Sequence, residues 1–245
     1  MAGRSLLGAR RTVRIVESSH SNHGSVQIRR SKGSHNRIMT ETTSERDYLP
    51  GMGKHFLLPL YDVVHRLFRV GRVHEEMIER AGLTAGQRVL DIGCGTGNLL
   101  RATATRRPDV ELSGLDPDPK ALARARRKVK KARLERGFAQ ELPYPDDSFD
   151  RVFSSLMLHH LDTKSKDEML AEVRRVLRPG GVFVLADIKV DQHSHGHGSR
   201  PMSEHLHDNV GDAIAQRLEA AGFTTEPTHT MILRKNWQVG IEVAR

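Results

Sequence analysis

An acid and three alternating glycines form the stretch of this chain with the clearest capacity for ligand binding. Residues 89–98 read Val-Leu-Asp-Ile-Gly-Cys-Gly-Thr-Gly-Asn, and a helix-compatible apolar stretch follows. Glycine tolerates positive φ and has no Cβ to obstruct a ligand. The N–H groups of such a turn, and the N-terminus of the next helix, can face a polar or anionic group. The order predicts strand, ligand-binding turn and helix; an ordinary strand-to-helix loop is the alternative.

A second acid ends the next predicted strand. Asp116 lies 25 residues after Asp91, at the end of the stretch 111–116. A carboxylate in that place can accept hydrogen bonds from both hydroxyls of a ribose. Sheets that bind NAD also have an acid in this place, so Asp116 alone does not indicate which cofactor binds. Asp91, which precedes the glycines, favours a cofactor other than NAD.

Two consecutive histidines follow the fourth predicted strand. His159 and His160 come after residues 149–156, at the edge where parallel sheets bind ligands. A neutral imidazole can take a proton from an acidic hydroxyl or an activated carbon. Neighbouring residues point in different directions, so one ring at most should face the cleft. We favour His160 as a base, with His159 capping the turn; in the alternative, the rings only shape the pocket.

The elements that must position these groups alternate along the chain. Repeated strand–helix units predict a doubly wound α/β fold with a mostly parallel, seven-stranded sheet and a C-terminal antiparallel hairpin. The strands are expected at 88–91, 111–116, 134–138, 149–156 and 182–187, with two more around 234–236. The helices are expected at 72–81, 97–105, 118–131, 164–177 and 207–221, with a turn at 178–181.

The positive charge of the chain is concentrated in its first residues. The formal net charge is +9 over 245 residues, and residues 1–38 hold eight Lys and Arg against one Glu. Residues 39–245 therefore carry only +2, which argues against nucleic acid as a partner of the domain. Cys94 is the only cysteine, so we expect a reducing, cytoplasmic location. No apolar run reaches the ~18 residues of a membrane span.

Composition divides the chain into three parts. Residues 1–45 are rich in Arg, Ser, His and Gly and lack periodicity, so we predict a disordered basic tail. An upstream start codon before Met39, or an organellar transit peptide, would explain residues 1–38. Residues 46–84 predict a helical cap, which either covers a ligand site or only packs on the sheet. Residues 85–245 form the predicted catalytic domain.

Four motifs in order give the central region a family resemblance. Residues 89–97, 112–117, 140–150 and 172–181 each match a motif of this family. Residues 85–190 resemble the core of class I S-adenosylmethionine-dependent methyltransferases, and more closely the branch that includes the ubiquinone and menaquinone biosynthesis C-methyltransferases. The resemblance implies methyl transfer from S-adenosylmethionine to a small, apolar or aromatic acceptor. It also implies a set of cofactor contacts: Asp91, Gly93, Cys94, Gly95, Gly97, Asn98, Asp116, Pro117, Ala139, Gln140 and Ser154.

One position departs from the family pattern. The family often has an acid after the third strand that contacts the adenine amino group, whereas this chain reads Gly137-Phe138-Ala139. Phe138 cannot accept that hydrogen bond, but it could pack on the ring or belong to the core. The backbone of Ala139, or Gln140, could bind the adenine instead. Asn98 has an alternative too, because it could cap the helix.

Other features carry weaker signals. Five histidines between 193 and 207 lack the spacing of metal ligands, so we expect a solvated loop and no metal. Seven Lys and Arg between 120 and 131 predict a solvated helix face, with RNA contact as the alternative. The alternative functions are an RNA or protein methyltransferase and a non-catalytic cofactor-binding module. The sequence determines neither the acceptor nor the oligomeric state.

Overall fold

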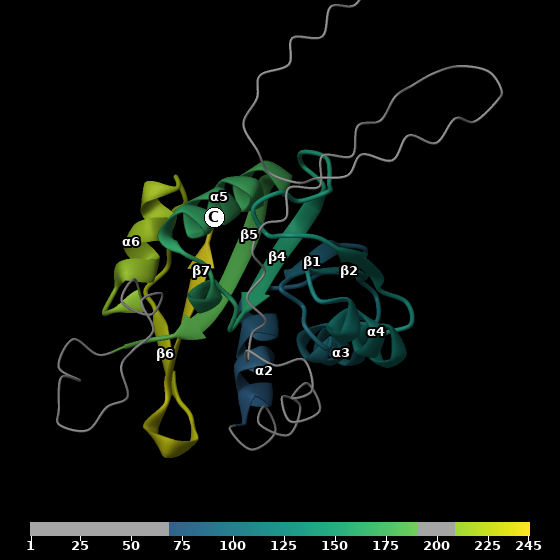
Figure 1. Ribbon diagram of the computed structural model, residues 1–245, viewed down its shortest axis with the longest axis horizontal. Helices are drawn as coiled ribbons and strands as arrows, with labels where there is room; N and C mark the ends of the chain where they lie inside the picture. Colours follow the sequence, from purple (N-terminus) through teal and green to yellow (C-terminus); the bar gives the residue numbers. More distant parts are fainter. Residues whose placement is uncertain (1–68, 191–208) are drawn as a thin grey trace, which may run out of the picture. The chain divides into compact units, whose positions relative to one another are not determined.

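The computed structural model describes residues 69–190 and 209–245, without the side chain of Lys235. Seven strands form one sheet in the order β3-β2-β1-β4-β5-β7-β6 (Figure 1). The strands are β1 (Arg88–Ile92), β2 (Glu111–Asp116), β3 (Arg133–Arg136), β4 (Phe149–Ser155), β5 (Leu177–Ile188), β6 (His229–Ile232) and β7 (Gln238–Ala244). Strands β1 to β5 pair in parallel, and β7 is antiparallel to both β5 and β6. The predicted fold class is confirmed.

Helices cover both faces of this sheet. They are α2 (Val70–Arg80), α3 (Asn98–Arg106), α4 (Pro119–Lys128), α5 (Thr163–Val176) and α6 (Ala213–Ala220), with 3₁₀ turns η2 (Leu158–His160) and η4 (Arg234–Asn236). Apolar residues of α2, α3 and α4 pack on one face, and those of α5 and α6 on the other. Successive residues of β5 alternate between the two clusters, with Val184 in the first and Leu185 in the second, as the pleat of a strand requires.

Three predicted elements differ from the structure by three or more residues at one end. β5 begins at Leu177, so residues 178–181 belong to a strand and not to a turn. The pairing of β4 with β5 slips between Phe149 and Arg151, and Gly180 absorbs the slip at φ 77°. α4 ends at Lys128, because Val129 leaves the helical region and packs in the core. Within the described part of the chain, α6 begins only at Ala213.

The carboxyl ends of β1, β2, β4 and β5 form one edge of the sheet. After β3 the chain returns past β1 to form β4, so the strand order reverses between the neighbouring strands β1 and β4. Ligands of open α/β sheets bind at such a switch point. The predicted tail 1–45, most of the predicted cap 46–84 and the histidine-rich stretch 191–205 lie outside the described residues. None of the described helices is long and apolar enough to cross a bilayer.

Candidate functional site

The glycine-rich turn after β1 is built on left-handed backbone. Gly93, Gly95 and Gly97 have φ of 70°, 52° and 77°, a region that side chains with a Cβ rarely adopt. Space is also limited, because a Cβ on Gly93 would lie 2.4 Å from Cγ of Met157. The N–H groups of Gly93 and Cys94 both donate to the carbonyl of Leu115, at 2.8 and 3.0 Å. The turn is therefore held against the end of β2.

The carboxylates of Asp91 and Asp116 lie near this turn, at the carboxyl ends of β1 and β2. Both are buried, at 2% and 7% exposure. Asp116 accepts from the N–H of Gly95 at 2.8 Å and from the N–H of Asp118 at 2.9 Å. Burial raises its pKa to about 6, although these two N–H groups oppose the rise. Burial, and then the charge of Asp116, raise the pKa of Asp91 well above its ordinary value.

Asp91 also keeps one oxygen without a partner among the residues that the structure describes. Within that part of the chain, its Oδ2 is buried and accepts no hydrogen bond, a state that is uncommon and unfavourable in a folded interior. A cationic or hydroxyl-bearing ligand at the turn would relieve it. The Oγ of Ser154, fully buried on β4 beside Ile92, is unpartnered as well.

The residues that follow the turn have structural partners. Asn98 is the first residue of α3 and does not cap it, because Gly97 occupies the cap position. The Oδ1 of Asn98 instead accepts from Nζ of Lys128 at 2.8 Å, and the same Nζ donates to Oγ1 of buried Thr96. Cys94 packs its thiol in the core, where burial raises its pKa. Its side chain is therefore part of the support of the turn.

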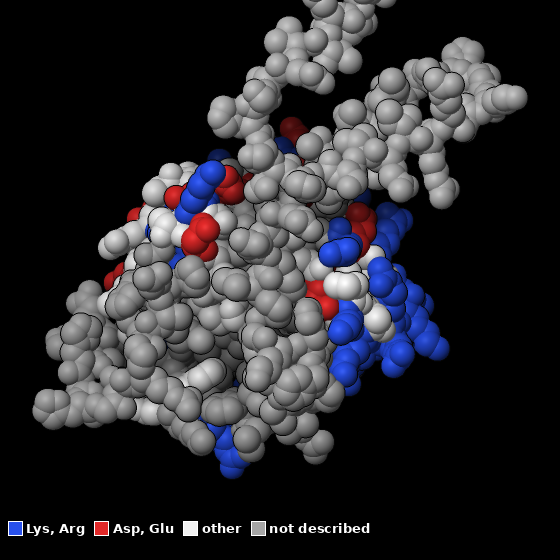
Figure 2. Space-filling model, in the orientation of Figure 1, with Lys and Arg blue, Asp and Glu red and all other residues white. Residues whose placement is uncertain are grey.

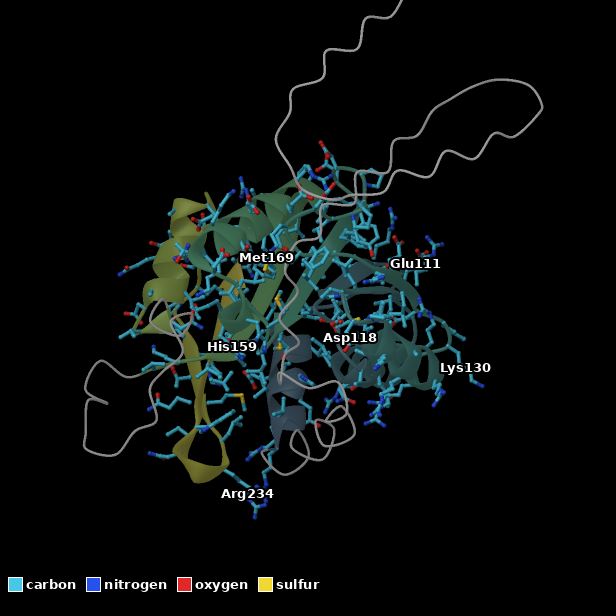
Figure 3. The ribbon with its side chains drawn as sticks, viewed as in Figure 1. Glu111, Asp118, Lys130, His159, Met169 and Arg234 are labelled. Carbon is cyan, nitrogen blue, oxygen red and sulfur yellow. The ribbon has the colours of Figure 1, made fainter. Side chains whose placement is uncertain are left out.

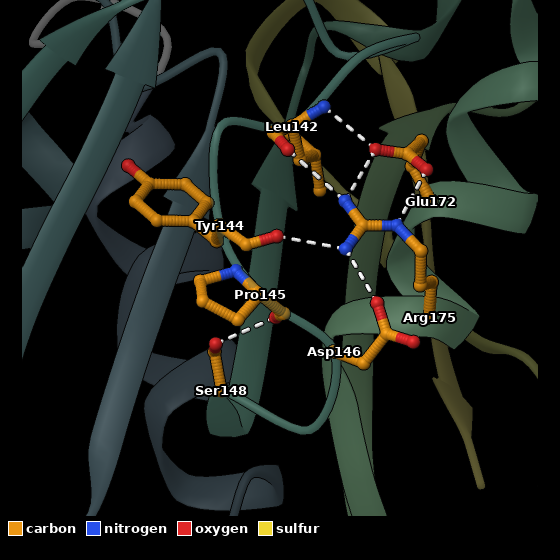
Figure 4. Close-up of polar contacts among 7 residues, drawn as sticks. All are labelled: Leu142, Tyr144, Pro145, Asp146, Ser148, Glu172 and Arg175. Atoms are coloured by element: carbon orange, nitrogen blue, oxygen red, sulfur yellow. Dashed lines mark hydrogen bonds and ion pairs between the residues drawn. The ribbon is translucent and has the colours of Figure 1, made fainter. Parts of the chain in front are cut away.

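The predicted adenine-binding segment begins a loop that Arg175 holds in place (Figure 4). The guanidinium of Arg175 donates to the carbonyls of Leu142 and Tyr144, at 3.0 and 2.7 Å, and pairs with Asp146 at 2.9 Å. Glu172 receives two bonds from it and accepts from the N–H of Leu142 at 2.7 Å. These contacts lower the pKa of Glu172. One side chain of α5 thus fixes the whole loop.

Within this segment, Ala139 is buried and Gln140 is partly buried. Phe138 is partly buried and lies in neither core cluster of the described residues. That placement favours a ring available to a ligand over a core residue. Pro117 lies next to Asp116, and its carbonyl accepts from Nε of Arg136 at 3.1 Å.

The two histidines have different surroundings. His159 and His160 lie in η2, directly after β4; His160 is exposed, whereas the side chain of His159 is 15% exposed. Nδ1 of His159 lies 2.6 Å from Oδ1 of Asp187, which is fully buried at the end of β5. Figure 3 shows His159 at this end of β4 and β5, and Asp118 beyond the end of β2.

Backbone bonds orient the acid of this pair. Asp187 accepts from the N–H of His159 at 3.1 Å and from the N–H of Ile188 at 2.6 Å. A carboxylate has no hydrogen to give, so Nδ1 of His159 must carry the shared one. Nε2 of the neutral ring then holds a lone pair, which is the state that a general base requires.

A strained residue connects the pair to the glycine turn. Leu156 has φ of 53°, an outlier for a residue with a Cβ, and such strain concentrates at functional sites. Its N–H donates to the carbonyl of Ala186 at 2.8 Å. The next residue, Met157, lies against Gly93, and His159 follows two positions later. The bend therefore brings the histidine pair beside the turn.

Sequence reasoning missed Asp187, Met157 and Arg175. Asp187 had a signal, because it is a third acid at the end of a predicted strand, after Asp91 and Asp116. Met157 and Arg175 had none, since their roles depend on contacts with Gly93 and with the loop 142–146.

Comparison with known proteins agrees with this geometry. Residues 89–181 match the family model of the methyltransferase domain. The 27-O-demethylrifamycin SV methyltransferase of Amycolatopsis mediterranei is 38% identical over 122 residues, 47% of this chain and 44% of that protein. The demethylmenaquinone methyltransferase of Thermus thermophilus is 35% identical over 138 residues, 54% of this chain and 62% of that protein.

The fold of the chain also matches a solved methyltransferase. A SAM-dependent methyltransferase from Aquifex aeolicus superposes with a TM-score of 0.57 at 21% identity, over 74% of this chain and 91% of that one. The similarity extends the class I methyltransferase fold beyond residues 89–181. The chain spans between 44% and 62% of the length of the first curated relatives it matches.

The residues of the turn fit S-adenosylmethionine, the cofactor expected of this domain. Gly95 has open space where a Cβ would stand, whereas a Cβ on Gly93 would meet Met157 and one on Gly97 would meet Ala125. Asp116 keeps lone pairs for ribose hydroxyls, and the unpartnered Oδ2 of Asp91 can accept from a cationic ligand. The two carboxylates therefore supply acceptor oxygens for ribose hydroxyls and negative charge that attracts a positively charged sulfur.

Proposed function

We propose that this protein transfers a methyl group from S-adenosylmethionine to a small, apolar or aromatic acceptor, with His159 as the general base. The observation that carries the proposal is the 2.6 Å pair between His159 and Asp187, two positions after a residue that touches the glycine turn. A base so close to the cofactor turn suits an acceptor that must lose a proton when it is methylated.

The cofactor half of the site would bind S-adenosylmethionine and remove it from water. Asp116 would hold the ribose hydroxyls, and Asp91 with the turn 93–97 would surround the methionine portion. Phe138 would pack on the adenine, while Ala139 and Gln140 offer it hydrogen bonds. When bound, the cofactor supplies a methyl group on a positively charged sulfur, which already makes that methyl a good electrophile. The remaining task of the chain is to align and activate the acceptor.

The acceptor half would move one proton. Asp187 holds the His159 ring by Nδ1, so Nε2 takes the proton from an acidic hydroxyl or an activated carbon of the acceptor. The acceptor oxygen or carbon would then bond to the methyl group that the cofactor supplies, and the cofactor sulfur would keep the electron pair of the bond it loses. Asp187 would stabilise the imidazolium of His159 that results. His160, exposed and 4.1 Å away between ring centroids, would shape the entrance.

The names of the relatives support a small acceptor. Demethylmenaquinone and 27-O-demethylrifamycin SV are the acceptors named for two relatives of this domain. The aligned regions of these two relatives cover 47% and 54% of this chain. The single cysteine of the chain supports a cytoplasmic location.

The test is turnover against pH with paired histidine variants. The full chain would be screened with S-adenosylmethionine and a panel of hydroquinones and phenols, with release of S-adenosylhomocysteine as the readout. His159→Gln should lower turnover by roughly 10²-fold or more and abolish its decline at acid pH. A glutamine amide can still donate to Asp187, so the buried carboxylate keeps a partner.

His160→Gln is the matched control, and it should change turnover by a few-fold at most. Both variants should bind S-adenosylhomocysteine as the wild type does in calorimetry. If His160→Gln has the larger effect, the assignment of the base to His159 is wrong. Cofactor binding without turnover on any acceptor would support a non-catalytic module instead.

A further inference from the structure

The folded part of the chain is electrically uneven. Residues 98–136 contain twelve Lys and Arg and five Asp and Glu, a net charge of +7. Residues 39–245 together carry +2, so the remainder of that region is net acidic, at −5. Figure 2 shows the Lys and Arg side chains gathered where Figure 1 places α4. The near-neutral total therefore conceals a strongly basic surface.

Helix α4 is the centre of this surface. Its apolar residues Ala121, Leu122 and Ala125 are buried. Lys120, Arg124 and Arg127, at i, i+4 and i+7, share one outer side of the helix. We call six exposed cations of this region the basic face: Arg101, Lys120, Arg127, Lys130, Lys131 and Arg133. Arg126 and Arg136 are exposed as well, but each donates to a backbone carbonyl.

The cations of the basic face are not neutralised by neighbours. Within the described ranges, 69–190 and 209–245, none of the six pairs with a carboxylate. The ion pairs of the region belong to Arg106, which meets Glu75 at 2.9 Å, and to Arg107, which meets Asp109 at 2.7 Å. An uncompensated cluster raises the local concentration of anions.

A cavity of about 490 Å³ opens beside this face, at the opposite edge of the sheet from the glycine turn. Lys131 and Arg133 line it together with Arg88 and Arg107, and Glu111 is its one acid. Its lining also includes the apolar residues Val110 and Leu112. The cavity gives the basic face a concave part in which cations converge, as contacts to phosphate require.

The side chains of the face favour one kind of polyanion. Among the described residues, the large apolar side chains that are exposed are Ile232 and Trp237, near η4 and away from α4. The basic face thus has no apolar anchor for a bilayer and no aromatic platform for the bases of a single strand. It offers charge alone, which matches the regularly spaced phosphates of a duplex.

We propose that the basic face binds the phosphate backbone of double-stranded nucleic acid, independently of base sequence. This binding goes beyond the proposed methyl transfer and does not depend on it. It would hold the enzyme on a nucleic acid while the opposite edge of the sheet serves a small acceptor.

The experiment uses two full-length triple variants that lose the same charge. Arg127→Gln/Lys130→Gln/Lys131→Gln removes half of the basic face. Arg72→Gln/Lys164→Gln/Arg234→Gln removes three exposed cations from α2, α5 and η4. The basic residues 1–38 are present in all proteins, so their contribution cancels. Fluorescence anisotropy would follow binding to a 20-base-pair RNA duplex and to a DNA duplex, from 50 to 200 mM salt.

The face variant should bind both duplexes at least about tenfold more weakly at 100 mM salt, with its salt slope lower by about 3. The control should stay within about threefold of wild type. Equal losses in both variants, or no binding by the wild type, would overturn the proposal. So would a stronger dependence on the face for vesicles with 30% phosphatidylserine than for either duplex.

A methylation readout separates this proposal from the proposed function. Labelled methyl groups incorporated into RNA would show that the small-molecule acceptor is wrong, while duplex binding through the face would stand. Loss of duplex binding with release of S-adenosylhomocysteine intact would show the reverse. Thermal melting of both variants would confirm that the substitutions leave the fold intact.

Discussion

The buried carboxylates in the two halves of the sheet differ in their hydrogen-bond partners. On β1 and β2, Asp91 and Asp116 are buried together; among residues 69–190 and 209–245 neither forms an ion pair, and one oxygen of Asp91 has no partner. On β4 and β5, Asp187 is fully buried, but it accepts hydrogen bonds from two backbone N–H groups and faces His159. The first half is left incomplete until a ligand arrives, whereas the second is internally satisfied.

This difference fits two kinds of chemistry. A site that must bind a cationic cofactor gains affinity if its carboxylates are short of partners beforehand. A site that must hold a base in one tautomer needs its partners in place before the acceptor enters. The comparison therefore leads us to expect a cost in stability on β1 and β2 that is absent on β4 and β5. Three measurements test it.

The largest effect should be a loss of stability between about pH 4 and pH 6 in the ligand-free protein. The pKa of Asp116 is raised in the folded state from an ordinary 3.8 to about 6. Between these two pKa values the folded protein holds a proton that the unfolded chain has released. The stability linked to this proton is fully present below pH 3.8 and is lost as the pH rises through 6. Two pH units correspond to roughly 3 kcal/mol.

Urea denaturation of the wild type and Asp116→Asn, from pH 4 to 7, measures this slope. The asparagine loses one acceptor for the N–H groups of Gly95 and Asp118, so the pH dependence is compared and not the absolute stability. The difference between the two proteins should vary with pH over that window. Parallel curves would remove Asp116 as the source of the cost.

The next effect is on cofactor affinity. Asp116→Ala removes the predicted ribose acceptor and the acceptor of two N–H groups at the turn. We expect a loss of about 1.5–3 kcal/mol in binding S-adenosylhomocysteine, which is about 10- to 150-fold. In calorimetry His159→Gln, from the other half, should retain wild-type affinity. If both variants bind equally weakly, the halves are not separate in function.

The smallest effect is expected at the loop that joins the halves. Arg175→Met removes the hydrogen bonds that Arg175 donates to Leu142, Tyr144, Asp146 and Glu172, and should lower the free energy of unfolding by about 1–3 kcal/mol. Lys164→Met is the control, because this Lys is 86% exposed and lies 3.5 Å from Glu168. That substitution should change stability by less than about 0.5 kcal/mol. Equal denaturation midpoints for the two variants would show that Arg175 does not hold the loop.

The fold was predictable because its signals are local. Alternating strand and helix patterns, with glycines and acids at the strand ends, define the sheet without any long-range information. The limits of β2 match the prediction residue for residue. The prediction was wrong at residues 178–181, which the Pro and two glycines marked as a turn, because β5 runs through them as an irregularity between two registers of its pairing with β4, in which Leu177 faces Phe149 and Val182 faces Arg151.

The sequence by itself determined the fold, the glycine turn and the two acids at β1 and β2, since each depends on residue types at fixed spacing along one segment. Only the tertiary structure decided which histidine has an oriented ring, which side chain supports the loop, and where the cations gather. His159 meets Asp187 across 28 positions, and Arg175 reaches a loop more than 30 positions away. Contacts between side chains on different elements leave no periodic trace in a sequence, because packing chooses them.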